Sequence, residues 1–79
     1  MIRREGKRLV LTFHTTADAI AIERLCKAKQ IAGRLIPVPR ELTSDCGMAW
    51  SMLPADRSEL ETALETNKIE IASWNLVEL

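Results

Sequence analysis

The sequence is poor in the residue types from which most recognisable sites are built. Among its 79 residues it has no tyrosine, one phenylalanine, two tryptophans, one histidine and two cysteines. A zinc site takes four ligands, which these cysteines and the histidine cannot supply without carboxylates. Two cysteines are also too few for the disulfide scaffold of a small secreted protein, so we expect free thiols, no metal and no bound cofactor.

Long hydrophobic runs are also missing. The longest apolar run is Ala19 to Ile22, whereas a helix that crosses a bilayer takes about 20 apolar residues. The basic N-terminal stretch, residues 1–8, is not followed by the hydrophobic region and small-residue cleavage site of a signal peptide. We therefore expect a cytoplasmic protein that makes no membrane contact.

A surplus of either charge is absent as well, because eleven basic residues balance eleven acidic ones. Nucleic-acid-binding modules usually carry a basic surplus, so no nucleic-acid partner is expected. No Ser-His-Asp set, phosphate-binding loop or pair of carboxylates stands out, which argues against an independent enzyme. The length and the 47% hydrophobic content predict one globular domain over residues 1–79, with residues 1–7 as a flexible basic tail.

The first half of the chain predicts a strand, a helix and a second strand. Residues 8–13 are apolar and β-prone enough for a central strand. A helix follows Thr15, whose side chain can cap the first N–H groups, and runs to about Gln30. Gly33 can end this helix or open the next turn. Residues 35–38 predict a short strand at an edge of the sheet, because prolines lack the N–H that a ladder needs.

The second half predicts the same alternation. Residues 48–53 form a strand that Pro54 stops. A second helix begins at Asp56 or Ser58, each of which has a glutamate at capping-box spacing, and closes near Asn67. Residues 69–74 alternate apolar and polar side chains, which is typical of a strand with one buried face. The order β-α-β-β-α-β predicts an α+β, ferredoxin-like domain with a four-stranded antiparallel sheet and two helices on one face.

The loop after the second predicted strand holds Cys46, and the residues leave its role open. A thiolate is nucleophilic, so a reactive cysteine should be reachable and near a cation such as Arg40. Gly47 removes a side chain next to the sulfur and would give a donor protein access. The alternative is a structural thiol, because free cysteine often packs as a small hydrophobic residue. In that case the domain would bind a partner protein or a second copy of itself.

Nearly the whole sequence, from about Leu9 to Ile71, resembles a family of small bacterial proteins described as selenium/sulfur carrier-like. The matching residues are Phe13, Thr15, Thr16, Ala19, Glu23, residues 36–42 and residues 44–47. The resemblance implies that Cys46 carries sulfur or selenium as a persulfide or selenylsulfide, with Arg40 and Gly47 among the matching positions around it. It also implies donor and acceptor proteins as partners, such as a desulfurase-type enzyme.

For the other two residues with reactive side chains, Cys26 and His14, the sequence favours roles without chemistry. Cys26 lies at the flank of the apolar stripe of the first helix, so we expect it in the core or at its boundary. His14 follows the first strand and could activate a nearby thiol. A solvated histidine is the commoner case, and the sequence alone does not place His14 or Arg40 near Cys46.

Overall fold

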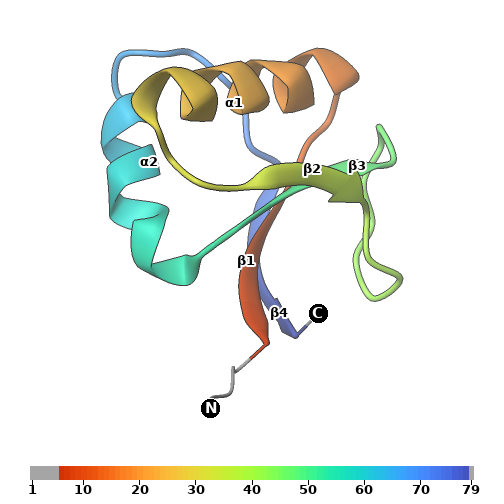
Figure 1. The fold of residues 1–79 in the computed structure, drawn as a ribbon. Helices are drawn as coiled ribbons and strands as arrows, with labels where there is room; N and C mark the ends of the chain where they lie inside the picture. The colour runs from red at the N-terminus through yellow and green to blue at the C-terminus, as the bar shows by residue number, and fades with distance from the viewer. Residues whose placement is uncertain (1–5, 79) are drawn as a thin grey trace.

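The computed structural model describes residues 6–78, which form a four-stranded sheet and two α-helices (Figure 1). In chain order the elements are β1 (Lys7–Thr12), α1 (Thr16–Lys29), β2 (Arg34–Pro37), β3 (Met48–Met52), the 3-10 turn η1 (Pro54–Asp56), α2 (Arg57–Leu64) and β4 (Ser73–Glu78). The sheet order is β2-β3-β1-β4, and every neighbouring pair is antiparallel. The predicted α+β class, with an antiparallel sheet of four strands, is confirmed. Residues 1–5 of the predicted basic tail lie outside the described part of the chain.

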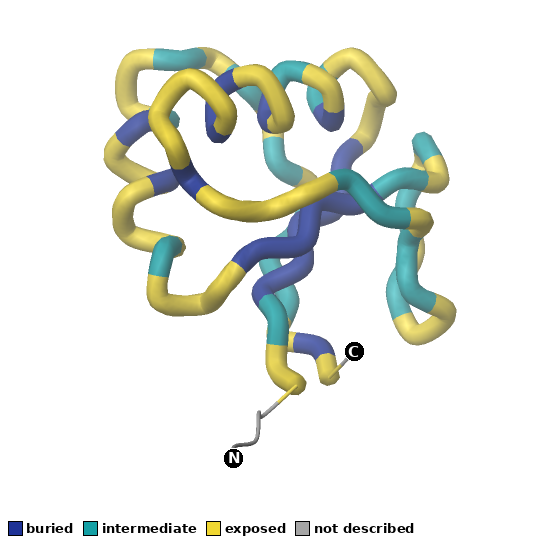
Figure 2. Tube along the Cα trace, viewed as in Figure 1, coloured by how far each residue is buried: buried dark blue, intermediate teal, exposed yellow. Residues whose placement is uncertain are grey.

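β1 is a central strand, as its continuous apolar sequence predicts. It pairs with β3 on one side, where Leu9 faces Met52 and Leu11 faces Trp50, and with β4 on the other side. Both faces of β1 are buried from Leu9 onwards (Figure 2). A strand that is covered on both faces gains burial from every side chain, which explains why no polar alternation appears before Thr12.

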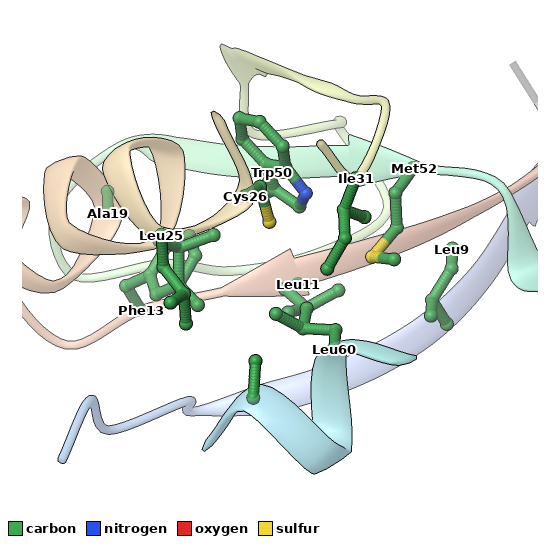
Figure 3. Close-up of a cluster of buried hydrophobic side chains, with 12 residues drawn as sticks. Leu9, Leu11, Phe13, Ala19, Leu25, Cys26, Ile31, Trp50, Met52 and Leu60 are labelled. Carbon is green, nitrogen blue, oxygen red and sulfur yellow. The ribbon is translucent and has the colours of Figure 1, made fainter. Parts of the chain in front are cut away.

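Both helices pack on the same face of the sheet. The side chains that meet there are Leu9, Leu11, Phe13, Ala19, Ile22, Leu25, Cys26, Ile31, Trp50, Met52, Leu60 and Ala63 (Figure 3). Alternate residues of β1 and β3 point to this face, and the helices contribute their buried stripes. This helix-side core is therefore assembled from β1, β3, α1, α2 and the connections next to them, and residues of the two edge strands pack at its border.

The opposite face of the sheet has its own smaller cluster. Val10, Ala49 and Val77 are buried there, and partly buried Ile36, Val38 and Leu42 pack against them. Val38 and Leu42 belong to the segment between β2 and β3. The loop that carries Cys46 is therefore attached to the sheet by apolar contacts on the face away from the helices.

α1 begins after Thr15 as predicted, but its C-terminal cap is Gln30 and not Gly33. The Thr15 hydroxyl accepts a hydrogen bond from the Asp18 N–H at 3.2 Å. The helix ends at Gln30, which takes the left-handed conformation at φ 61°. Gly33 does not cap the helix. The close packing of the Trp50 ring explains a glycine at this position, because a Cβ there would lie 2.6 Å from the ring.

α2 follows a 3-10 turn and has no side-chain cap at its start. Neither predicted capping box forms, because η1 already fills the turn before Arg57. The helix is also shorter than predicted and ends at Leu64. Its C-cap is Glu65, and Asn67 lies beyond it, where its Nδ2 donates to the Ala63 carbonyl at 2.8 Å.

The last strand was predicted too early in the sequence. β4 spans Ser73–Glu78, whereas residues 69–72 connect α2 to the sheet. Ile69 and Ile71 alternate because they pack against the border of the helix-side core. The phase of the alternation changes before β4, where Trp74 packs against the same core and Val77 belongs to the opposite face. Pairing with β1 defines where β4 begins. The register aligns Thr12 with Ser73, and the N–H of Ala72 donates to the Thr12 carbonyl.

Candidate functional site

The candidate site lies on residues 38–47, which connect edge strand β2 to β3 and are called the carrier loop below. In Figure 1 it is the yellow-green excursion beyond β2. Its two ends are joined, because the Val38 N–H donates to the Gly47 carbonyl at 3.1 Å. Within it, one turn closes between Leu42 and Pro39, at 3.0 Å. The loop is thus a closed hairpin with a fixed position.

Cys46 occupies a second turn of this loop. The Gly47 N–H donates to the Ser44 carbonyl at 3.3 Å, so Cys46 is a central residue of a four-residue turn. It is partly buried, and its side chain packs at the border of the helix-side core. Its Sγ lies 3.6 Å from the Met48 carbonyl oxygen and 3.6 Å from the Ser44 hydroxyl. The sulfur is therefore held by two polar neighbours.

Ser44 joins this turn to the start of α1. Its Oγ lies 3.2 Å from the Phe13 carbonyl oxygen and 3.2 Å from that of Met48. A hydroxyl has one proton, so Ser44 donates to one of these carbonyls at a time. If Cys46 ionises, the same proton can turn to the sulfur, because a thiolate is a charged acceptor and a carbonyl is not. Among the side-chain hydrogen bonds of residues 6–78, the hydroxyl of Ser44 is the one side-chain donor that contacts the sulfur of Cys46.

His14 and Asp45 form a second link between the carrier loop and the segment before α1. Nδ1 of His14 lies 3.4 Å from Oδ2 of Asp45. Their side chains are 51% and 77% exposed, and an ion pair that exposed contributes little to stability. The contact nevertheless places the only histidine against the residue before Cys46.

Arg40 is not part of this contact network. It lies in the turn between Pro39 and Leu42 and is exposed. Among the hydrogen bonds and ion pairs of residues 6–78, none joins Arg40 to Cys46. Electrostatic support of the thiolate by Arg40 therefore does not follow from a direct contact and remains a prediction.

Gly47 takes a conformation that favours glycine, with φ 78°. Nothing lies within 4 Å of the place that a Cβ would occupy. Apart from its two chain neighbours, the surroundings of Gly47 are therefore open, and backbone conformation explains a glycine here.

Cys26 lies in a contrasting environment. It points from α1 into the helix-side core and is fully buried (Figure 3). Burial raises the pKa of the Cys26 thiol to about 11, because a buried thiolate loses its hydration. The predicted core position is confirmed. Cys26 and Cys46 are both free thiols, and Cys46 is the one with access to solvent.

Sequence reasoning missed the roles of Ser44 and Asp45. Both appear in the sequence analysis only within residues 44–47, as part of the family resemblance. Their partners Phe13 and His14 are 31 positions away. No local pattern signals such contacts, because they exist only once β1 and β3 pair.

Other site classes find little support in the structure. Within residues 6–78, no group of three or more histidine, cysteine and carboxylate side chains is arranged to hold a metal ion. None of the helices in this part of the chain combines the length and the apolar character needed to cross a membrane.

These features define a small α+β protein with one partly exposed thiol on an anchored loop. The chain belongs to the family described as "Putative Se/S carrier protein-like", whose pattern it matches over residues 8–74. The match includes the carrier loop and both cysteines. No match was found among curated proteins or among solved structures.

Proposed function

We propose that the protein carries sulfur or selenium on Cys46 and hands it from a donor protein to an acceptor protein. One observation supports this most directly: the thiol of the family-matched loop is partly exposed in an anchored turn, whereas the other thiol is fully buried. A carrier needs a thiol that partner proteins can reach and whose position does not wander. The partial exposure of Cys46 and the hydrogen bonds that close its turn support both requirements.

The loading step is an exchange of a sulfur atom between two thiols. The Cys46 thiolate attacks the outer sulfur of a persulfide on the donor protein. The new S–S bond forms on Cys46 while the S–S bond of the donor breaks, and the donor cysteine leaves as a thiolate. A donor selenylsulfide would transfer selenium in the same way. No external oxidant or reductant is consumed, and a desulfurase-type enzyme is the expected class of donor.

The neighbours of Cys46 have distinct roles in this proposal. The Ser44 hydroxyl can donate to the thiolate, and the Met48 carbonyl accepts from the thiol. Gly47 leaves room for the thiol of the partner. Arg40, without a contact to the sulfur, acts through the wider field of the loop or through the acidic surface of a partner. The protein itself is then a carrier rather than an independent catalyst.

The topology supports a ferredoxin-like assignment for the fold. β3 lies between β1 and β2, and β1 lies between β3 and β4, so each helix connects strands that are not neighbours. This is the split arrangement expected of two interleaved β-α-β units. Two free thiols and a persulfide cargo also favour a reducing compartment, for which we propose the cytoplasm.

Intact mass spectrometry tests the carrier proposal. The protein is purified without reductant and incubated with a cysteine desulfurase and cysteine, or with a selenium donor. We expect a reductant-labile gain of one sulfur or selenium atom, lost in Cys46→Ser and retained in Cys26→Ser. Folding of both variants is checked by circular dichroism.

Alkylation of the folded protein separates the carrier from a structural thiol. The packing of Cys46 against the border of the core and its contact with the Met48 carbonyl favour this alternative. If Cys46 reacts only after unfolding and no adduct forms under any loading condition, the carrier proposal is wrong. The carrier loop is then an element of a protein-binding domain.

A further inference from the structure

The two edges of the sheet are protected to different degrees. Edge strand β2 ends at Pro37, and Pro39 follows two residues later. Prolines and charges on an edge discourage pairing with another chain. The other edge strand, β4, contains no proline and a single charged residue, Glu78. Within residues 6–78 it is paired on one side only, with β1.

Exposed apolar side chains gather beside this unprotected edge. Leu76 is 62% exposed and Leu53 is 46% exposed. A surface depression of about 580 Å³ lies between them, and its lining residues are Gly6, Lys7, Leu53, Pro54, Leu76 and Glu78. Leu76 is the register partner of Leu9, so both side chains lie on the helix side of the sheet. Leu9 is buried there, whereas Leu76 extends beyond the cover of the helices.

The charges along this edge have both signs. Glu78 is the register partner of Lys7. Near the other end of β4, the Arg57 guanidinium lies over the Trp74 ring, 4.5 Å from its centroid. Trp74, Leu76 and Glu78 alternate along the strand and share a face. Each end of the edge carries both signs, because Glu78 has Lys7 opposite it and Arg57 pairs with Glu61 of its own helix at 3.2 Å. In an antiparallel copy the Glu78 end of one strand meets the Arg57 end of the other, so that Glu78 of one copy approaches Arg57 of the second.

We propose that two copies of the chain associate through antiparallel pairing of their β4 strands about a two-fold axis at Leu76. In this register each Leu76 lies opposite the same residue of the second copy. Trp74 of one copy then lies opposite Glu78 of the other, which brings the carboxylate of Glu78 toward Arg57. The pairing satisfies the free backbone groups of both edges and covers Leu76 and the depression beside it.

The proposed dimer leaves the candidate site free. The carrier loop connects β2 and β3 at the opposite edge of the sheet. Joining two β4 edges makes one continuous sheet of eight strands with a carrier loop near each end. Dimer formation therefore requires neither Cys46 nor its cargo, and it can be tested independently of the carrier proposal.

Analytical ultracentrifugation from micromolar to millimolar concentration tests the association. We expect a monomer–dimer equilibrium that Leu76→Lys weakens by about tenfold or more, because it places two like charges at the axis. Glu78→Arg should also weaken the dimer, and the combination with Arg57→Glu should restore it. The matched control Ile20→Lys changes an exposed apolar residue on α1 and should leave association unchanged.

Crosslinking tests the register. In a Cys46→Ser background, Leu76→Cys should form an intermolecular disulfide under mild oxidation, and Thr43→Cys on the carrier loop should not. A chain that stays monomeric at millimolar concentration overturns the proposal. A dimer that Leu76→Lys leaves intact also overturns it, and crosslinking through Thr43→Cys alone would place the interface elsewhere. Leu76 is exposed, so thermal unfolding of Leu76→Lys and Leu76→Cys checks that both variants fold.

Discussion

Ser44 Oγ lies 3.6 Å from the sulfur of Cys46 and within 3.2 Å of two carbonyl oxygens, those of Phe13 and Met48. One hydroxyl thus holds the turn of the carrier loop against the segment before α1 and stands beside the thiol. Its single proton is shared among acceptors whose strengths change when Cys46 ionises. The chemistry proposed for the loop and the packing of the loop therefore both involve Ser44.

Ser44→Ala should slow alkylation of folded Cys46 at neutral pH. The variant removes a donor to the thiolate, so the pH–rate profile should shift toward higher pH with little change in the plateau rate. The loss of the tie to Phe13 should also lower the free energy of unfolding by about 1 kcal/mol. Iodoacetamide kinetics over pH and chemical denaturation measure these effects.

Ser44→Thr serves as the matched control, because it retains the hydroxyl. A lowered plateau without a shifted profile in Ser44→Ala would mean that Ser44 only positions the loop. Equal behaviour of the two variants would also contradict a role for the hydroxyl.

Asp45→Asn should raise the alkylation rate of Cys46 at neutral pH by about two- to fivefold. A carboxylate beside a thiol disfavours the thiolate. The repulsion between two exposed charges on neighbouring residues amounts to about 1 kcal/mol or less. Glu41→Gln is the control, since it removes the same charge from the separate turn at Pro39–Leu42. A similar rate increase in both variants would show a general charge effect. A third variant, His14→Gln, reports on the contact with Asp45.

The two glycines should respond to alanine for different reasons. Gly47→Ala should lower the free energy of unfolding by about 1–2 kcal/mol, because φ 78° is strained for alanine although the space is open. Gly33→Ala should cost about 3 kcal/mol, since its Cβ would lie 2.6 Å from the Trp50 ring and 2.8 Å from the Ser51 carbonyl oxygen. Urea denaturation compares them, and a larger loss for Gly47→Ala would refute this assignment.

Cys26 should make stability depend on alkaline pH. Its pKa is raised from 9.0 to about 11 in the folded protein, so the unfolded chain releases this proton first as the pH rises. The free energy of unfolding therefore falls between pH 9 and pH 11, by about 3 kcal/mol over the window, and the stabilising contribution is fully present below it. Chemical denaturation at a series of pH values measures the slope.

Cys26→Ala should remove this slope, although it lowers stability at neutral pH by leaving a small cavity. Cys46→Ser should retain the slope and provides the control. An unchanged slope in Cys26→Ala would assign the alkaline loss of stability to other groups, such as lysines.

Much of the fold followed from local chemistry. The apolar run of β1, the Thr15 cap, the prolines at the end of β2 and Pro54 after β3 each act over a few residues, so the sequence alone predicted their positions. The start of β4 was wrong by several residues. Alternation indicated an extended segment but could not distinguish Ile69 and Ile71, which pack at the border of the core, from residues that pair with β1.

The sequence by itself determined that the protein is a small α+β domain with two thiols, and it singled out Cys46 through the pattern of residues around it. Only the tertiary structure decided the environment of each thiol. It buried Cys26 in the core, brought Ser44 and His14 into the network around the carrier loop, and left Arg40 without a contact to the sulfur. The contacts of Ser44 and His14 join residues 31 positions apart, which come together because β1 pairs with β3. The strength of such contacts is set by distances of a few ångströms, which no local sequence pattern specifies.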